Sequence, residues 1–139
     1  MDEPLSPPKP RPVPTATSAP FWVALDQERV VLQHCGACGA WVFYPRSRCP
    51  RCRSDRLAWE PVSGDGTLFS FTVARQATFP AFADEVPQVI AVVELAEGVH
   101  LTSTIVGAAP EDVRIGAAVT PVFDHGDDGR TLLRFRLAG

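Results

Sequence analysis

Hydrophobic and polar residues alternate most regularly in the second half of the chain, which predicts β-strands there. Short apolar or alternating stretches are separated by Gly, Pro and Asp turn residues. The predicted strands cover residues 67–74, 89–95, 99–106, 118–123 and 131–137, with a turn at 127–129. In the first strand, even-numbered side chains from Leu68 to Thr72 are expected on one face and odd-numbered ones from Phe69 to Val73 on the other. A short helical connection over 109–116 follows the third strand, and this order is typical of a five-stranded Greek-key barrel of the OB type.

The first half of the chain contains shorter predicted elements around two pairs of cysteines. Residues 20–25 are mostly apolar, with Ser18 as a candidate N-cap and Pro20 in the first turn, so a short helix ending near Glu28 is expected. Three short strands are predicted at residues 29–33, 41–44 and 57–62, where they flank the cysteine pairs and form one small unit. The sequence thus predicts an all-β protein in which a short helix and this small unit precede the barrel.

Residues 1–19 differ in composition from the rest of the chain. They contain six prolines among Ser, Thr, Lys and Arg. Such a segment buries too little apolar area to offset its ordering entropy, so an extended or disordered linker is expected, of a kind that suits a junction with a preceding domain. The predicted organisation is a linker over 1–19, a helix with the cysteine unit over 20–62, and the barrel over 63–139.

The four cysteines of the chain have the spacing of a metal site. They are Cys35, Cys38, Cys49 and Cys52, two Cys-x2-Cys pairs that are ten residues apart. The short gap within each pair lets a tight turn direct both sulfurs at one ion, and the ten-residue gap is long enough for one hairpin. Four thiolates in a tetrahedral arrangement favour zinc, although iron would bind the same cage. We therefore predict one structural zinc ion, whose four thiolate ligands leave no open position for catalysis.

Two disulfides or a redox-active pair are the alternative interpretations of these cysteines. The chain has no basic start followed by an apolar run, so we expect a cytoplasmic protein, in which disulfides are rare. A thioredoxin-type pair belongs at the start of a helix, whereas these cysteines lie in predicted hairpins. His34 directly precedes Cys35, so its side chain is expected to point away from the metal and toward the surface.

Charge is distributed unevenly along the chain. The formal net charge is −3, yet residues 29–56 carry six arginines against one acidic residue, and residues 57–139 carry five arginines against eleven acidic ones. An acidic barrel half repels phosphate backbones, which makes nucleic acid an unfavourable ligand. No stretch has the length and hydrophobicity of a membrane span.

No catalytic motif can be assembled from the remaining residues. All four cysteines are assigned to the metal, and no Ser-His-Asp set or Gly-rich phosphate loop is present in the sequence. The long loop over 76–88 contains Phe79 and Phe82, two aromatic residues that either contact a partner or ligand or fold back over the barrel. The sequence therefore predicts a protein that does not catalyse a reaction by itself.

Several motifs together resemble one known family. They are Phe21-Trp22, residues 31–39 with the first cysteine pair, Tyr44-Pro45-Arg46 before the second pair, residues 59–67 with Ser-Gly-x-Gly, residues 113–116, and Val122-Phe123. They are similar to the paired rubredoxin-like zinc ribbons and acyl-CoA-associated OB-folds long labelled a domain of unknown function. The resemblance covers residues 20–139. Arg53 departs from it, because related ribbons often place Gly after the last cysteine to form a left-handed turn.

The resemblance implies an accessory role in acyl-CoA metabolism. Such proteins are non-catalytic subunits of thiolase-superfamily enzymes. One branch pairs with a sterol-carrier-protein-type thiolase homologue to form an aldolase (a lyase of lipid and steroid degradation) that cleaves steroid side-chain CoA thioesters by a retro-aldol step. In that branch a hydratase-like domain precedes the ribbon and barrel in the same polypeptide. The expected partner is thus a thiolase-like subunit in a heteromeric complex, with acyl-CoA bound in the complex.

Candidate contacts with the partner or with coenzyme A follow from residue types. Phe21 and Trp22 either anchor a partner or cover the seam between ribbon and barrel. Arg46 and Arg48 lie near the cysteines, where they either offset thiolate charge or bind an anion such as the phosphates of coenzyme A. Two other functions compete with the subunit role: a single-stranded nucleic-acid-binding protein, since zinc ribbons and OB-folds occur there, and a stand-alone acyl-CoA-binding protein.

Overall fold

The structure is a computed structural model that describes residues 9–10, 12–77, 79–126 and 129–138. In chain order its elements are α1 (Ala19–Asp26), β1 (Val30–Cys35), β2 (Trp41–Val42), β3 (Leu57–Val62), β4 (Gly66–Ala74), the 3-10 helix η1 (Pro80–Glu85), β5 (Gln88–Leu95), β6 (His100–Ile105), the 3-10 helix η2 (Pro110–Asp112), β7 (Ala118–His125) and β8 (Thr131–Leu137). Residues 1–8 and 11 of the predicted linker, and 127–128 of the predicted turn, lie outside the described ranges.

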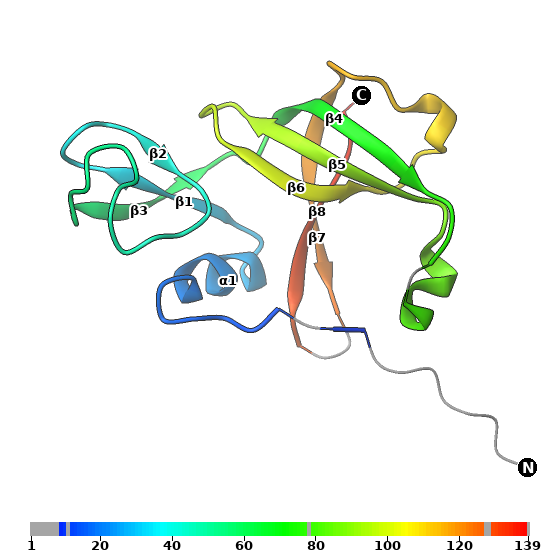
Figure 1. The fold of residues 1–139 in the computed structure, drawn as a ribbon, viewed down its shortest axis with the longest axis horizontal. Helices are drawn as coiled ribbons and strands as arrows, with labels where there is room; N and C mark the ends of the chain where they lie inside the picture. The colour runs from blue at the N-terminus through cyan, green and yellow to red at the C-terminus, as the bar shows by residue number, and fades with distance from the viewer. Residues whose placement is uncertain (1–8, 11, 78, 127–128, 139) are drawn as a thin grey trace, which may run out of the picture.

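The strands form two sheets that lie side by side (Figure 1). A three-stranded sheet of order β2-β1-β3 carries the cysteine turns. Its strands β1 and β3 pair antiparallel from Val30↔Val62 to Cys35↔Leu57, while β2 pairs with β1 at only two positions. We predicted a strand through Tyr44, but β2 ends at Val42. After Val42 the side chain of Gln33 takes the place of a neighbouring strand: it forms hydrogen bonds with the backbone carbonyl and amide of Arg46.

The second sheet is a closed barrel of order β4-β5-β6-β8-β7, which confirms the predicted five-stranded OB-like barrel. Four of its five contacts between neighbouring strands are antiparallel, as expected from the hairpin turns. The exception is the parallel contact between β6 and β8, where a single registered pair, Ile105↔Phe135, closes the barrel. The β6–β8 seam is therefore the most weakly paired part of the barrel wall.

The expected division of β4 into two faces is wrong after its third residue. The pairing of β4 with β5 shifts between Leu68 and Ser70, which marks a β-bulge. One extra residue reverses the alternation, so Leu68, Phe71 and Val73 pack on the same core, and Phe69 is 53% exposed. A simple period-two pattern cannot reveal such a bulge, because both faces of this strand contain apolar residues.

One hydrophobic core extends from the barrel into the base of the ribbon. Leu32 of β1 belongs to the same buried cluster as the barrel residues, and Trp41, Phe43 and Val62 pack against it. Helix α1 lies below the ribbon and beside β7 and β8 (Figure 1), and buries Phe21, Ala24 and Leu25. The ribbon and the barrel are thus joined by shared side chains as well as by the chain between β3 and β4.

The ends of α1 differ in detail from the prediction. Ser18 is the N-cap residue, but its Oγ accepts a hydrogen bond from the amide of Thr15 and makes none to the helix. The helix ends at Asp26, and Glu28 has φ 57°, which turns the chain toward β1.

None of the helices among the described residues has the length and apolar character required to cross a membrane.

Candidate functional site

The four cysteines lie at the free end of the ribbon, and their sulfur atoms form one cluster. The Sγ atoms are all within 4.8 Å of one another. Cys35 Sγ is 3.6 Å from Cys52 Sγ, and Cys38 Sγ is 3.7 Å from Cys49 Sγ. Four sulfurs bound to zinc at about 2.3 Å in a tetrahedron are separated by about 3.8 Å. The sulfur atoms therefore already have the spacing that a tetrahedral zinc ion requires.

This geometry excludes disulfide bonds. All four cysteines are free, and the separations between their sulfur atoms are far longer than the S–S bond of about 2.05 Å. Nor does either pair begin a helix, since Cys35 ends β1 and Cys49 follows the turn after β2. The predicted structural zinc site is confirmed by the donor set and its spacing.

The two cysteine turns have the same backbone geometry. After the first pair, the amide of Gly39 donates to the carbonyl of Cys35 at 2.9 Å, and after the second, the amide of Arg53 donates to the carbonyl of Cys49 at 2.8 Å. Gly39 has φ 78° and Arg53 has φ 66°, so both are left-handed. Arg53 replaces the glycine expected from related ribbons, yet the turn is preserved and Arg53 carries the strain of that conformation.

Backbone amides make the buried sulfurs acidic. The amide of Cys38, and then that of Ala37, point at the sulfur of Cys35 and lower its pKa to about 6. The amides of Cys52 and Arg51 likewise lower the pKa of Cys49. Although the amide of Ser54 lowers the pKa of Cys52, burial and the other three cysteines raise it to about 12. The raised pKa of Cys52 disfavours its thiolate in the absence of a cation, and a divalent metal held by the four sulfurs would supply the compensating charge.

A buried glutamine fixes the segment that follows β2. Gln33 is 4% exposed, and its side chain donates to the carbonyl of Arg46 and accepts from the amide of the same residue, both at 2.8 Å. Gln33 was not among the predicted site residues, although a polar residue within an apolar strand indicates a buried hydrogen-bonding role. The two hydrogen bonds of Gln33 fix the position of the Arg46 backbone and of the turn that leads to Cys49.

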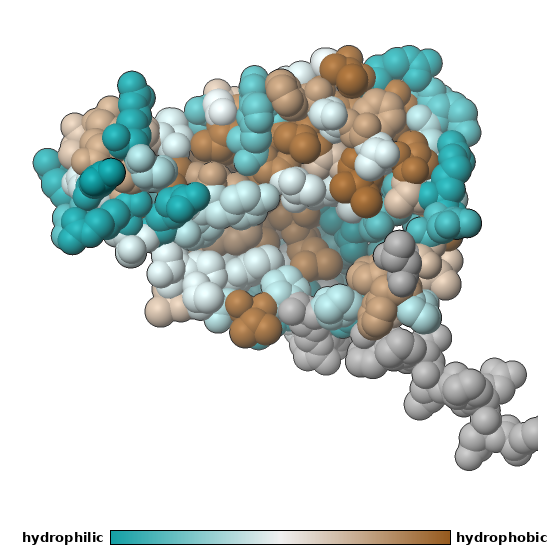
Figure 2. All heavy atoms as spheres, in the orientation of Figure 1, coloured by the Kyte–Doolittle hydropathy of each residue, from teal (hydrophilic) through white to brown (hydrophobic). Residues whose placement is uncertain are grey.

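The arginines near the metal lie at the surface. Arg46 and Arg48 are exposed, and the guanidinium of Arg48 donates to the carbonyl of Arg53 at 3.2 Å. Figure 2 shows hydrophilic side chains covering the free end of the ribbon. No described hydrogen bond joins either arginine to a cysteine sulfur, and their role in binding an anion stays a prediction.

His34 is held between the ribbon strands and does not point at the metal. Its ring stacks on Trp41 with centroids 4.0 Å apart, Nδ1 lies 2.7 Å from Glu60, and Nε2 lies 3.1 Å from the carbonyl of Gly39. His100 and His125 are also paired with carboxylates, those of Glu94 and Glu28. The other ring nitrogen of His125, Nδ1, lies 2.9 Å from the hydroxyl of Thr131, a residue that is 3% exposed.

The aromatic candidates are placed differently from one another. Phe21 is buried, with ring centroids 5.3 Å from Trp22 and 5.5 Å from Phe43, so it fills the seam between ribbon and barrel. Trp22 is half-buried beside it. Phe79 is exposed, and Phe82 is half-buried under the ammonium of Lys9. The loop that contains Phe79 and Phe82 is linked to the barrel by an ion pair between Glu85 and Arg134, 3.5 Å apart. This contact supports the expectation that the loop folds back over the barrel.

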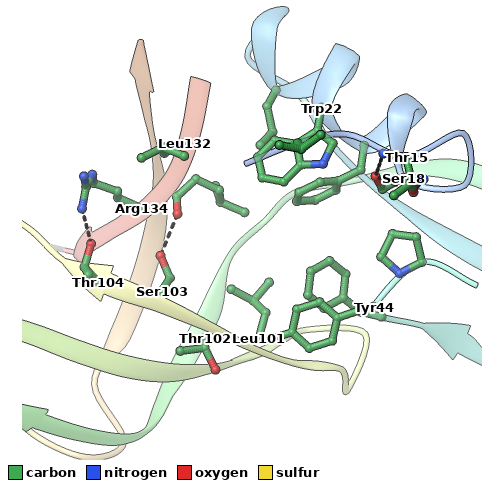
Figure 3. Close-up of a pocket in the computed structure, with 16 residues that line it drawn as sticks. Thr15, Ser18, Trp22, Tyr44, Leu101, Thr102, Ser103, Thr104, Leu132 and Arg134 are labelled. Atoms are coloured by element: carbon green, nitrogen blue, oxygen red, sulfur yellow. Dashed lines mark hydrogen bonds between the residues drawn. The ribbon is translucent and has the colours of Figure 1, made fainter. Parts of the chain in front are cut away.

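A hollow of about 550 Å³ adjoins the metal-binding unit (Figure 3). Three regions surround it: α1 with the residues before it, the segment after β2, and the β6–β8 seam. Trp22, Tyr44 and Leu132 are among its walls. The hollow could not be predicted from the sequence, because its walls come from α1, β6, β8 and the segments before α1 and after β2, which are distant in the chain.

Comparisons with known proteins match both parts of the chain. Residues 22–58 match the family model described as the ChsH2 rubredoxin-like zinc ribbon domain, and residues 59–124 match the ChsH2 C-terminal OB-fold domain. A solved structure described as the Ltp2-ChsH2(DUF35) aldolase contains a chain with 36% identity and a TM-score of 0.84, covering 93% of this chain and 100% of that one. A DUF35-family protein of unknown function from Sulfolobus solfataricus has 17% identity and a TM-score of 0.65, and therefore supports the fold alone.

Curated relatives include proteins of two sizes. A DUF35 domain-containing scaffold protein of Methanocaldococcus jannaschii is 40% identical over 101 residues, or 68% of this chain and 70% of that protein. A probable enoyl-CoA hydratase alpha subunit of Thermomonospora curvata is 38% identical over 94% of this chain, which spans 40% of that protein's length. A 3-oxo-4,17-pregnadiene-20-carboxyl-CoA hydratase alpha subunit of Mycobacterium tuberculosis is 33% identical over 81% of this chain and 35% of that protein.

Proposed function

Because the chain belongs to the DUF35 family, with a zinc ribbon and OB-fold of the ChsH2 type, we propose that it is a non-catalytic accessory subunit of an acyl-CoA enzyme. The partner is a thiolase-superfamily subunit, and the complex is an aldolase that cleaves steroid side-chain CoA thioesters by a retro-aldol step. In this role the chain binds and stabilises the partner and supplies no catalytic group.

One observation carries this proposal. The chain matches all of one chain in the solved structure described as the Ltp2-ChsH2(DUF35) aldolase, at 36% identity and a TM-score of 0.84. The names of the archaeal relatives, which describe scaffold proteins, point to the same kind of role. The hydratase names of the longer relatives support a second element of the proposal, a hydratase-like domain that precedes residues 20–139 in the same polypeptide.

The distribution of reactive groups is consistent with a scaffold. All four thiols belong to the metal cluster, and each of the three histidines is bonded to a carboxylate. The exposed arginines of the ribbon and exposed Phe79 supply charged and aromatic contact surface instead. We propose that Arg46 and Arg48 meet an anionic group, such as a coenzyme A phosphate, where chain and partner join.

The experiment that tests the role is reconstitution with the partner. The tagged chain is purified from its host, the thiolase-like protein that co-purifies is identified by mass spectrometry, and both are then expressed together. A stoichiometric complex with retro-aldol activity toward a steroid side-chain CoA thioester, absent from either subunit alone, is the expected result. Recovery of the chain alone, or with nucleic acid, would overturn the proposal.

Paired arginine variants test the contact surface. Replacing Arg46 and Arg48 by Ser should weaken the complex or raise the KM for the CoA thioester, and should do so less at high salt. The matched control replaces Arg75 and Arg136, which are exposed on the barrel, by Ser. Equal effects of both pairs would show that only net charge matters and that the ribbon arginines have no specific role.

A further inference from the structure

The hollow beside α1 reaches the part of the barrel wall where two strands separate. Strands β6 and β8 share only the pair Ile105↔Phe135. Beyond it, side chains bridge the strands: Ser103 Oγ donates to the carbonyl of Leu133 at 2.7 Å, and Arg134 donates to Thr104 Oγ1 at 2.8 Å (Figure 3). Residues of both strands line the hollow at this seam.

The walls of the hollow are mainly apolar. Aromatic side chains from α1 and from the segment after β2 lie on one side, and leucines of β6 and β8 lie on the other; they are Phe21, Trp22, Phe43, Tyr44, Leu101 and Leu132. Figure 2 shows the molecular surface hollowed between the barrel strands and the helix. Tyr44 at the opening is 54% exposed, so an apolar ligand would remove aromatic surface from water.

Among the described residues that line the hollow, none carries an unpaired charge that would attract an anion. The one charged side chain among the described residues that line the hollow is Arg134. Its guanidinium forms ion pairs with Asp124 at 2.6 Å and with Glu85 at 3.5 Å, which neutralise its charge. Thr104 Oγ1 accepts a hydrogen bond from Arg134, which leaves the proton of this hydroxyl available to donate. A neutral ligand with one accepting oxygen suits this site better than a phosphate or a carboxylate.

We propose that this hollow binds the neutral, ring-containing hydrocarbon body of a small molecule, with a ligand oxygen near Thr104. A volume of about 550 Å³ lies within the range of small-molecule sites. The proposal rests on the proposed function and deepens it: the ring body belongs to the acyl group, or to the neutral ketone released from it, while the charged nucleotide remains outside the hollow. The flat aromatic walls favour fused rings over a flexible chain.

The test uses progesterone, a neutral fused-ring ketone, with the zinc-loaded full chain. The chain contains three tryptophans, and Trp22 is the one that lines the hollow. In ¹⁵N NMR spectra, progesterone should shift the indole signal of Trp22, assigned with Trp22→Phe, and leave those of Trp41 and Trp59 in place. Coenzyme A and dodecanoate, which are anionic, should not shift it.

A matched pair of variants locates the binding. Tyr44→Ala removes an aromatic side chain that is 54% exposed at the opening, and Phe69→Ala removes one that is 53% exposed on the outer barrel. Tyr44→Ala should weaken progesterone binding about tenfold, and Phe69→Ala should leave it unchanged. Equal binding by both variants, an unmoved Trp22 signal, or an equal response to dodecanoate would overturn the inference.

The outcome is separable from that of the proposed function. A chain that assembles with the thiolase-like subunit but leaves Trp22 unmoved refutes the hollow as a ligand site and leaves the scaffold role intact. A chain that binds progesterone at Trp22 but forms no complex supports the hollow and refutes the scaffold role.

Discussion

The free end of the ribbon and the barrel are stabilised in different ways. At the free end, the buried cluster consists of Cys35, Val42 and Cys49, with Ala40 and Leu57 packed against it. The barrel encloses a cluster that includes Phe135 and Val93, both 0% exposed, and to which β1 of the ribbon contributes Leu32. Two of the three residues in the smaller cluster are metal ligands, so the ribbon tip has almost no hydrophobic core of its own.

This difference shows which part of the molecule requires the metal. The base of the ribbon is held by the barrel core, whereas a metal ion bound by the four sulfurs would hold the tip. We therefore expect the barrel to keep its fold without the metal and the order of the tip to depend on zinc. Changes in the two regions should therefore have separable effects.

The largest effect is expected from removing a metal ligand. Cys35→Ser eliminates a buried thiolate of the cluster, and structural zinc contributes about 10–16 kcal/mol to the folding of small domains. The variant should lose its zinc and the NMR dispersion of residues 35–57, and should no longer assemble with the partner, while signals from the barrel persist. Metal analysis and ¹⁵N spectra measure this. Wild-type protein treated with a chelator serves as the control and should behave in the same way.

A smaller and complementary effect is expected from a cavity in the barrel. Phe135 is a 0% exposed member of the larger cluster, so Phe135→Ala should lower the free energy of unfolding by about 3–5 kcal/mol. Zinc should remain at one ion per chain in the native variant. Urea denaturation followed by fluorescence measures the loss, and Phe69→Ala, at 53% exposed, should change it by less than about 0.5 kcal/mol. Zinc loss in native Phe135→Ala would contradict the separation of the two regions.

Much of this architecture could be predicted from sequence, because its signals are local. The spacing of the four cysteines specifies the metal cage, and period-two strands specify the barrel. Strands β3 and β8 begin and end at the predicted residues, 57–62 and 131–137. These features depend on neighbours within a few residues, which a single sequence displays directly.

Other features depend on tertiary contacts that the sequence does not display. The bulge at Leu68 and Ser70 reverses the faces of β4 only because β5 pairs with it in a shifted register. The early end of β2 depends on the side chain of Gln33, which is thirteen residues from Arg46. The hollow requires the β6–β8 seam to lie against α1, although these elements are far apart in the chain.

An intermediate effect is expected where the two regions meet. Gly64 has φ 80°, and a Cβ there would lie 2.9 Å from Pro121 Cγ of β7 and 3.0 Å from Val30 Cγ2 of β1. Gly64→Ala should cost about 1–3 kcal/mol and should destabilise ribbon and barrel together. Gly98→Ala is the matched control, because Gly98 has φ 92° and a Cβ added there would meet no atom within 4 Å. The difference between the free energies of unfolding of the two variants, measured by urea denaturation, is the contribution of the steric clash at Gly64. Equal losses of stability in the two variants would mean that backbone strain alone is responsible.

The smallest effect is expected from the left-handed residue of the second cysteine turn. Arg53 has φ 66° where the first turn has Gly39 with φ 78°, so Arg53→Gly should relieve strain and stabilise the zinc-bound tip by about 1 kcal/mol. Competition with a chelator measures this as slower or weaker zinc extraction. Arg53→Gly also removes a positive charge beside the thiolates, and this loss should weaken zinc binding. Arg51→Gln removes a nearby positive charge without altering the turn, so it measures the contribution of charge alone. If Arg53→Gly releases zinc more readily than Arg51→Gln, the Arg53 side chain stabilises the site and the two turns are equivalent in backbone geometry only.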